Sequence, residues 1–532
     1  MEWSRLLSPE RIRGVKQRAG SGDLRTEFEK DYHRIIGSAS FRRLQDKTQV
    51  FPLDKSDFIR TRLTHSLEVS SFAKSLGQSV SQRIIQEGKD AAFLPSYQAD
   101  ICDILQCAGL LHDIGNPPFG HFGETVIREW FQEHMPRLYF KGSPLTELLT
   151  EQMQQDLYHF EGNTQALRVV SKLHYLVDEH GMNLTMALMG TIIKYPVSSL
   201  EINKKSGDIH TKKMGYFAAE RDIFDTIQGT LGTKGRRHPL AFLLEAADDI
   251  AYKTADVEDA FKKGCITYEQ LLGELCKEAG YTVEEARVLV EASGNRNGHS
   301  TGQTKSTGGN LKKIAAAEER GMCGESKDDA GCVEAKDAVE SSPDTETLEY
   351  LKLVLLLEKR YVQACGRDIT RPAMNAVQNW VVSVQGRLLA CATDNFMKHY
   401  EEIIAGSFQK ELLSEGAGAR LARVLGDIAY RYAFITEPIY KLEIAAQTIM
   451  NFLLERFVKA AVVYDTGEKM SAVQEKLMSL VSDNYKAIYR IFSQGKTEQE
   501  KLYLRLLLVT DYVCGMTDSH AKRLYQELSG IL

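Results

Sequence analysis

The most informative segment of this sequence is LLHDIGNPPFGHFGE, residues 110–124. Apolar residues recur every three or four positions between Ile101 and Leu111, which predicts a buried helix. A glycine and two prolines follow shortly afterwards and stop that helix. His112 and Asp113 therefore lie side by side at the end of a buried helix. An imidazole and a carboxylate in this position can both reach one divalent cation.

The rest of the chain shows the same helical spacing. Apolar residues recur at intervals of three and four in segments 67–84, 240–261, 348–357, 444–458 and 502–513. The alternation typical of strands is hard to find, and only residues 200–209 offer short candidates. We therefore predict an all-α, mainly helical fold.

Composition excludes several classes of protein. The 66 basic and 72 acidic residues give a formal net charge of −6, so no overall basic field indicates nucleic-acid binding, although a local basic groove stays open. None of the nine cysteines forms a CxxC pair, which argues against a zinc ribbon or a thioredoxin-type site. No apolar run approaches the length of a membrane span, and the first residues carry charges where a signal peptide is apolar. We expect a cytoplasmic protein without a membrane partner.

Two more residues of the type that bind metals lie on apolar helices. RLTHSLEV, residues 62–69, places His65 near the start of one helix, and LLEAADDIAYKTADVEDA, residues 243–260, places Asp248 inside another. A buried carboxylate needs a cation or strong hydrogen-bond donors. A lone His-Asp pair also fits a solvated helix end, but the order H…HD…D, with separations of 47 and 135 residues, is the pattern of the HD superfamily of metal phosphohydrolases.

Further motifs make this resemblance more specific. Five of them occur in order around those already quoted: FRRLQDKTQVFPL (41–53), HFEGNTQALR (159–168), KYP (194–196), MGYFAAE (214–220) and GMTDSHA (515–521). With these motifs the chain resembles the deoxyguanosinetriphosphate triphosphohydrolase family, from near its start to about residue 521. The resemblance implies an HD-domain helical core with an additional C-terminal helical lobe, a preference for dGTP and a homohexamer.

The chain divides into five expected segments. They are an N-terminal helical segment that carries a substrate-site glutamine (1–60), an HD phosphohydrolase core (61–265), a helical connection (266–293), a flexible low-complexity insertion (294–344) and a C-terminal helical lobe (345–532). The insertion is rich in Gly, Ser, Thr, Lys and Asp, so it cannot bury enough apolar area to offset its ordering entropy. We expect it to be mobile and remote from the chemistry.

The resemblance also assigns a metal site. Its ligands are His65, His112, Asp113 and Asp248, which would bind a divalent cation, with Mn²⁺ or Mg²⁺ expected first and Fe, Co or Zn as alternatives. Helix geometry favours Asp248 over Asp249. At 100° per residue, Asp248, Tyr252 and Asp256 share one face within roughly 80°, whereas Asp249 points about 100° away.

His121 and Glu124 form a candidate catalytic pair. They are three residues apart in the expected first turn after the NPPFG loop, so the carboxylate can hold the imidazole's tautomer and raise its basicity. The resemblance makes this pair catalytic. Water would attack the α-phosphorus, His121 would give a proton to the departing 5′-oxygen, and the products would be the deoxynucleoside and inorganic triphosphate.

The remaining site residues are implied by the resemblance and are expected to bind substrate. Arg62, Lys194 and Lys213 would contact phosphate oxygens, and Asn163 would lie near the triphosphate. The expected sugar-binding residues are Gln49, Tyr252 and Asp256, with Gln49 close to the 3′-hydroxyl.

Three alternatives remain open: a triphosphohydrolase of broader dNTP specificity, another HD phosphohydrolase such as a nucleotidase or cyclic-dinucleotide phosphodiesterase, and an HD-fold nucleic-acid-binding protein. Some members of the family respond to single-stranded DNA, so that effector is a further expectation. The sequence shows no basic stripe interleaved with aromatic residues that would support it.

Overall fold

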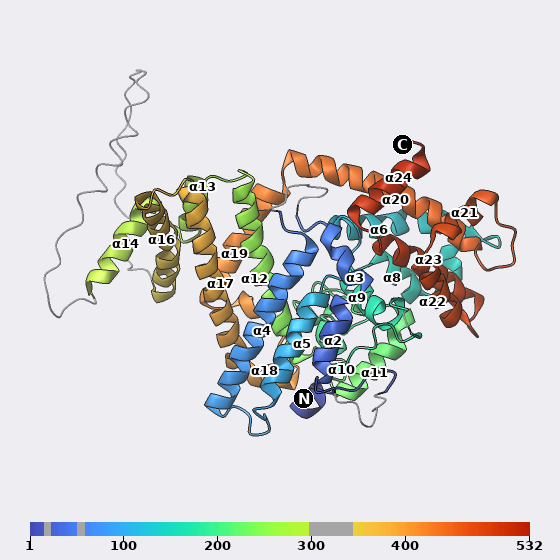
Figure 1. Ribbon diagram of the computed structural model, residues 1–532, viewed down its shortest axis with the longest axis horizontal. Coiled ribbons are helices and arrows are strands. Elements are labelled where there is room, and N and C mark those ends of the chain that lie inside the picture. Colours follow the sequence, from blue (N-terminus) through green and yellow to red (C-terminus); the bar gives the residue numbers. More distant parts are fainter. Residues whose placement is uncertain (15–22, 51–58, 176, 297–343, 532) are drawn as a thin grey trace, which may run out of the picture.

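The computed structural model describes residues 1–14, 23–50, 59–175, 177–296 and 344–531. Regular secondary structure in the described residues is helical apart from one short hairpin and two isolated bridges, which confirms the prediction of an all-α fold (Figure 1). The hairpin pairs β1 (Tyr139–Phe140) with β2 (Ser143–Pro144) in antiparallel register. Its turn, Lys141 and Gly142, has positive φ at both residues, as tight hairpins require.

The short strand candidates within residues 200–209 do not form strands. The segment begins in the 3₁₀ turn η4 (Ser199–Glu201) and leads to the 3₁₀ turn η5 (Ile209–Thr211). Between the two, the Asn203 N–H donates to the carbonyl of Thr211, and the Ser206 hydroxyl donates to the carbonyl of Asn203. These local hydrogen bonds compete with strand pairing and fold the segment on itself.

A first hydrophobic core unites helices from the N-terminal two thirds of the chain with several later ones. They are α1 (Trp3–Leu6), α2 (Glu27–Ile36), α3 (Ala39–Arg43), α4 (Arg62–Glu87), α5 (Tyr97–Leu111), α9 (Gly162–Arg168), α10 (Met186–Ile192), α11 (Arg221–Leu231), α12 (Pro239–Lys262), α13 (Tyr268–Glu278), α14 (Val283–Arg296), α16 (Thr345–Gly366), α17 (Pro372–Lys398), α18 (Tyr400–Ala405) and α19 (Ala417–Ala429).

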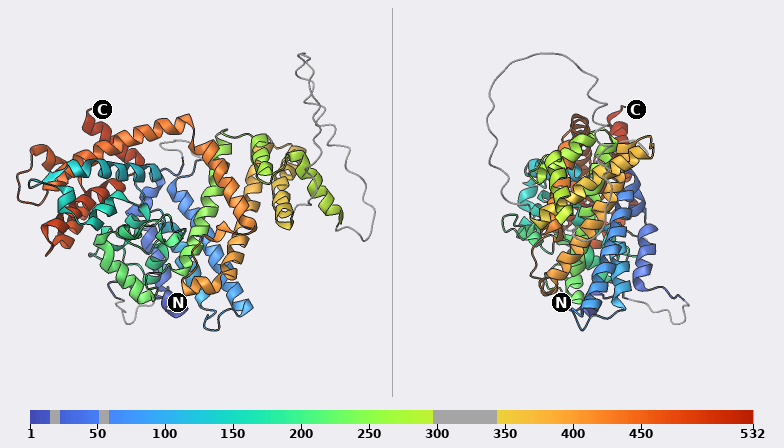
Figure 2. Two further views of the ribbon diagram at one scale, coloured as in Figure 1. Left: turned by 180° about the vertical axis from the view of Figure 1, so that it is seen from behind. Right: turned by 90° about the vertical axis from the view of Figure 1, so that its left-hand side faces the viewer.

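A second core combines an earlier group of helices with the C-terminal ones. They are α6 (Gly120–His134), α7 (Leu145–Leu148), α8 (Glu151–Tyr158), α20 (Glu437–Val463), α21 (Ala472–Leu480), α22 (Asp483–Ser493), α23 (Glu498–Cys514) and α24 (Asp518–Ser529). Helix α20 extends from one group of helices to the other (Figures 1 and 2), and Tyr485 and Phe492 of α22 pack against both cores.

Single 3₁₀ or π turns connect many of these helices. Those not yet named are η1 (Leu44–Asp46), η2 (Met135–Arg137), η3 (Val169–Leu173), η6 (Ala218–Glu220), η7 (Leu412–Ser414) and η8 (Tyr430–Phe434). No helix in the described ranges is long and apolar enough to cross a membrane.

Three helices of the first core, α4, α5 and α12, pack against one another and carry the residues expected to bind metal. A glycine permits the close approach of α4 and α5, because a Cβ at Gly109 would lie 2.4 Å from the Cα of Ser70. The start of α12 is fixed by His238. Its Nδ1 accepts a hydrogen bond from the Leu240 N–H, and its Nε2 donates to the carbonyl of Leu6.

A sharp turn then takes the chain from the first core to the second. Gly115 follows α5 and packs so closely on α9 that a Cβ there would lie 2.2 Å from the amide nitrogen of Ala166. Phe119 and Gly120, at the start of α6, both have left-handed φ angles, 62° and 61°. A short turn therefore joins the end of α5, in the first core, to the first turn of α6, in the second core, and both ends carry candidate site residues.

Most of the expected 294–344 insertion, residues 297–343, lies outside the described residues. At its borders, α14 continues to Arg296, and the Asp344 carboxylate caps α16 by accepting from the Thr347 N–H at 2.6 Å. The division into five segments stays a prediction.

Candidate active site

The four residues expected to bind metal lie together. His65 comes from the first turn of α4, His112 and Asp113 from the end of α5, and Asp248 from the middle of α12. Ligand-type atoms of His65, His112 and Asp113 lie within 4.8 Å of one another. Asp248 is outside that group of three, but its Oδ1 lies 3.2 Å from His65 Nε2 and 3.4 Å from His112 Nε2. Two imidazoles and two carboxylates thus converge on one small region.

The hydrogen bonds of the histidines suit a divalent cation. His112 Nδ1 donates to the carbonyl of Gly109 at 2.7 Å, so its Nε2 carries a lone pair toward the carboxylates. That Nε2 is buried and has no hydrogen-bond partner among the described residues. A ligating histidine usually has this arrangement, with its second nitrogen donating to a carbonyl or carboxylate. His65 does not share this arrangement, because its buried Nδ1 has no hydrogen-bond partner among the described residues.

Cations surround the two carboxylates and keep them ionised. Arg62 donates to Asp113 Oδ2 at 2.5 Å, Asn116 donates to Asp113 Oδ1 at 2.7 Å, and Lys194 donates to Asp248 Oδ2 at 2.8 Å. Burial raises the pKa of both carboxyls, but the adjacent cations and imidazoles outweigh burial and hold both pKa values well below the usual range. Arg62 and Lys194, expected to contact phosphate, thus lie at the site, paired with its carboxylates.

The structure joins the expected catalytic pair. His121 Nδ1 lies 3.1 Å from Glu124 Oε2, whereas the other carboxylate oxygen accepts from the Gly162 N–H at 2.6 Å. The Glu124 side chain is only 3% exposed, but that of His121 is 78% exposed. One nitrogen of the imidazole is therefore held by a fixed carboxylate while the ring remains accessible to a bound molecule.

The same contact separates the pKa values of the pair. The hydrogen bond that His121 donates to Glu124 and the negative charge of Glu124 raise the pKa of His121. Burial alone would raise the pKa of Glu124, but His121 and nearby cations lower it to about 2. The arrangement therefore favours an ionised carboxylate beside a protonated imidazole, which is the form needed to donate a proton.

Lys213 and Asn163 lie near this pair, not among the metal-binding residues. Lys213 Nζ donates to Glu161 Oε2 at 2.8 Å, and Arg128 joins Glu161 to Glu124 through contacts of 2.9 and 3.1 Å. Asn163 is half-buried in the first turn of α9, next to the glycine that holds Glu124. Lys213 can therefore supply positive charge on the His121 side of the site.

The face of α12 that carries Asp248 also carries two of the expected sugar-binding residues. The neighbouring Asp249 has other partners, because its carboxylate accepts from Lys253 Nζ at 2.9 Å and from the Tyr252 hydroxyl. Asp256 is 3% exposed, and its Oδ1 has no hydrogen-bond partner among the described residues. Burial and neighbouring carboxylates raise the pKa of Asp256 well above its usual value. Gln49 Oε1 is likewise buried without a partner there, and such groups mark where a ligand's polar atoms can bind.

Sequence reasoning missed Arg128, Glu161 and Asn116. Arg128 is four residues after Glu124 on α6, so helical spacing could have placed them on one face. Glu161 and Asn116 lie inside quoted motifs, but no periodic signal shows that Glu161 meets Lys213 or that Asn116 binds Asp113.

Replacing Glu124 by Gln should lower the pKa of His121, because the substitution removes the charge that raises it. Diethyl pyrocarbonate modifies only the neutral imidazole, so modification of His121 should begin at lower pH in Glu124→Gln than in the wild type. Mass spectrometry of the His121 peptide across a pH series measures this shift. Glu133→Gln, an exposed substitution on the same helix, is the control. An unchanged midpoint in Glu124→Gln would show that the pair is not coupled.

Comparisons with known proteins show the family of this chain. The HD domain family matches residues 62–180, which contain His65, His112 and Asp113. A deoxyguanosinetriphosphate triphosphohydrolase-like protein of Listeria monocytogenes is 43% identical over the full length of both chains. One from Synechocystis is 31% identical, again over both full lengths. The deoxyguanosinetriphosphate triphosphohydrolase of Yersinia enterocolitica is 29% identical over 94% of this chain and 93% of its own. The chain belongs to the deoxyguanosinetriphosphate triphosphohydrolase family.

Proposed function

We propose that this protein hydrolyses dGTP to deoxyguanosine and inorganic triphosphate with the help of a divalent cation. The proposal rests on the proximity of two groups of side chains. One is a cluster of two imidazoles and two ionised carboxylates, and the other is an exposed imidazole whose pKa is raised by a buried carboxylate. A cation site beside a proton donor suits hydrolysis of a phosphate ester.

The cation ligands in this proposal are His65, His112, Asp113 and Asp248. A mixed nitrogen and oxygen set suits Mn²⁺ or Mg²⁺, with Fe, Co or Zn as alternatives. A bound cation would polarise a phosphoryl oxygen and favour deprotonation of a nearby water.

Arg62 and Lys194 have a second role when substrate binds. Each is paired with a carboxylate of the cluster, and each is almost fully buried. The oxygens of a bound triphosphate can replace the carboxylates as partners of Arg62 and Lys194. The carboxylates of Asp113 and Asp248 are then free to bind the divalent cation. Lys213 adds positive charge on the other side, beside Asn163, so phosphate oxygens meet donors as charge develops on them.

His121 supplies the proton that the reaction needs. Attack of water at the α-phosphorus breaks the bond to the 5′-oxygen, and protonated His121 donates to that oxygen as it leaves. Glu124 stays ionised and stabilises the imidazolium before the transfer. The deoxyribose and its 3′-hydroxyl would be bound by Gln49, Tyr252 and Asp256. Binding of the sugar at these residues would place the 5′-oxygen next to His121.

Several finer expectations stay predictions. They are strict preference for guanine, assembly as a homohexamer, an effect of single-stranded DNA and a cytoplasmic location. The alternative of a broader specificity, in which other dNTPs are also hydrolysed, differs only in the nucleobase that the site accepts. The comparison of four dNTPs below distinguishes the two.

Asp248→Asn should remove the bound metal and abolish turnover, because it takes one charge from the proposed ligand set. Asp249→Asn is the matched control, since Asp249 is the next residue of α12 and binds Lys253. Metal content of the purified proteins, measured by plasma mass spectrometry after Mn²⁺ loading, should fall only in Asp248→Asn. Loss of metal from both variants, or from neither, would contradict the ligand assignment.

His121→Ala should lower kcat by about 10²–10⁴-fold, the usual contribution of a general acid, and should keep the metal. Chromatography of reactions with dGTP, dATP, dCTP and TTP, each with Mn²⁺ or Mg²⁺, measures rates and products. We expect dGTP to react fastest and every product pair to be deoxynucleoside and triphosphate. Loss of metal in His121→Ala would make His121 a ligand. Pyrophosphate or orthophosphate as the first product would contradict the proposed reaction.

A further inference from the structure

The motif GMTDSHA, residues 515–521, has no part in the reaction proposed above. It lies between α23 and α24, about 400 residues after the HD motif in the sequence. Asp518, the first residue of α24, is nevertheless only 2% exposed and reaches two loops that lead to substrate-facing residues. This buried carboxylate calls for an explanation, because an exposed position is usual for aspartate at a helix start.

Asp518 connects the two loops with one side chain. Its Oδ1 accepts from the backbone N–H of Phe119 at 2.9 Å. Its Oδ2 accepts from the backbone N–H of Thr48 at 2.9 Å and also from the Thr48 hydroxyl. Phe119 is two residues before His121, and Thr48 is directly before Gln49. The same carboxylate is therefore bound next to the proposed proton donor and next to a proposed sugar-binding residue.

The backbone at Phe119 needs such a partner. Its φ of 62° is in the left-handed region, which is unfavourable for a residue with a side chain. The next residue, Gly120, is confined as well, because a Cβ there would lie 2.4 Å from Arg62 Nη2. The hydrogen bond to Asp518 holds this strained turn in the one arrangement that starts α6 beside the cation cluster.

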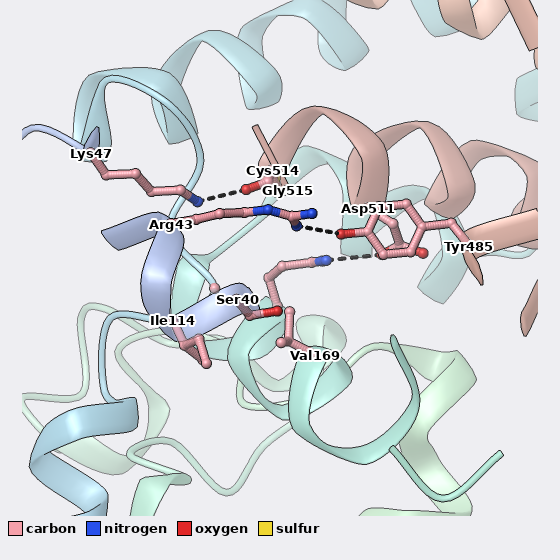
Figure 3. A pocket seen from close by; sticks show the side chains of 11 residues that line it. Ser40, Arg43, Lys47, Ile114, Val169, Tyr485, Asp511, Cys514 and Gly515 are labelled. Carbon is pink, nitrogen blue, oxygen red and sulfur yellow. Dashed lines mark hydrogen bonds between the residues drawn. The ribbon is translucent and has the colours of Figure 1, made fainter. Parts of the chain in front are cut away.

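A second contact reinforces the connection. The Lys47 side chain is buried, and its Nζ donates to the carbonyls of Asn116 at 2.6 Å and Cys514 at 2.7 Å. Figure 3 shows Lys47 reaching the end of α23 at Cys514, with Gly515 beside it. Asn116 in turn donates to Asp113. The end of α23 thus binds the loop of Lys47 and Thr48, and the start of α24 binds both this loop and the loop of Phe119.

We propose that Asp518 is a positioning residue that places His121 through Phe119 and Gln49 through Thr48. This inference rests on the proposed function, since it concerns residues assigned to that reaction. A carboxylate is needed because the three groups that meet it are all donors, and an ionised Asp only accepts. An Asn amide keeps one acceptor oxygen but turns an NH₂ group toward one of the loops.

Asp518→Asn should therefore lower kcat by about 10–100-fold, the loss expected from a misplaced catalytic group. The loss should disappear when His121 is already absent. In a double-mutant cycle, adding Asp518→Asn to His121→Ala should change kcat by less than about threefold. Equal losses in both backgrounds would show a general structural effect and would overturn the proposal. Asp518→Asn should also raise KM, because it releases the backbone that places Gln49. This rise should vanish in the Gln49→Ala background, and a rise that persists there would contradict the role through Thr48.

Hydrogen exchange tests the connection without any substrate. Peptides that cover Phe119 and Thr48 should exchange faster in Asp518→Asn than in the wild type, whereas Asp483→Asn should leave them unchanged. Asp483 is a matched control, since it is also the first residue of a helix, α22, but its side chain is 97% exposed. Unchanged exchange in Asp518→Asn would overturn the proposal. A wild-type protein that releases no triphosphate would instead contradict the proposed function, and the exchange result would still decide whether Asp518 holds the loops.

Thr48→Val provides a second route if Asp518→Asn does not fold. It removes only the hydroxyl donor to Asp518, and Thr48→Ser retains that donor as the conservative control. We expect Thr48→Val to lower kcat/KM and Thr48→Ser to restore it, with no further loss from Thr48→Val in the Gln49→Ala background. Equal activity of Thr48→Val and Thr48→Ser would contradict a role for the Thr48 contact.

Discussion

Two partly buried carboxylates, Asp113 and Asp248, set the charge to which the cations of the site are paired. Their charge would be unfavourable in the interior without partners, and removing one partner from a buried ion pair typically costs about 3–5 kcal/mol. Arg62 and Lys194 provide those partners, and each is itself almost fully buried. The same cations are the groups best placed to bind a triphosphate. In the proposed reaction, a triphosphate would replace the carboxylates as the partner of Arg62 and Lys194, and a divalent cation would replace these side chains as the partner of the carboxylates.

The second unit of the site lies on another helix and in another core. Helix α6 carries His121 and Glu124, and its apolar face packs in the second core, whereas α4, α5 and α12 belong to the first. Catalysis in this account requires that the boundary between the cores stays fixed. The hydrogen bond of Asp518 to Phe119 holds the tight turn between the two cores. The hydrogen bond of Lys47 to the Cys514 carbonyl joins the loop before α4 to the end of α23. This explains why a motif near the end of the sequence accompanies an active site near its start.

Sequence reasoning predicted what local periodicity and chemistry specify. Apolar spacing predicted the all-α fold, and the 100° rotation per residue separated Asp248 from Asp249, which the structure places with different partners. It failed at 200–209, where hydrogen bonds of Asn203 and Ser206 with nearby groups replace strand pairing. The contacts of Asp518 with Phe119 and Thr48 join residues 399 and 470 positions apart, so no local pattern reports them.

In the proposed reaction, water attacks the α-phosphorus and the bond to the 5′-oxygen breaks. A single turnover of dGTP in H₂¹⁸O, followed by mass spectrometry of both products, tests which bond breaks. We expect one ¹⁸O atom in the inorganic triphosphate and none in deoxyguanosine. Label in deoxyguanosine would place the attack on carbon, and labelled dGMP or pyrophosphate would place the cleavage at another bond. Either result would contradict the account.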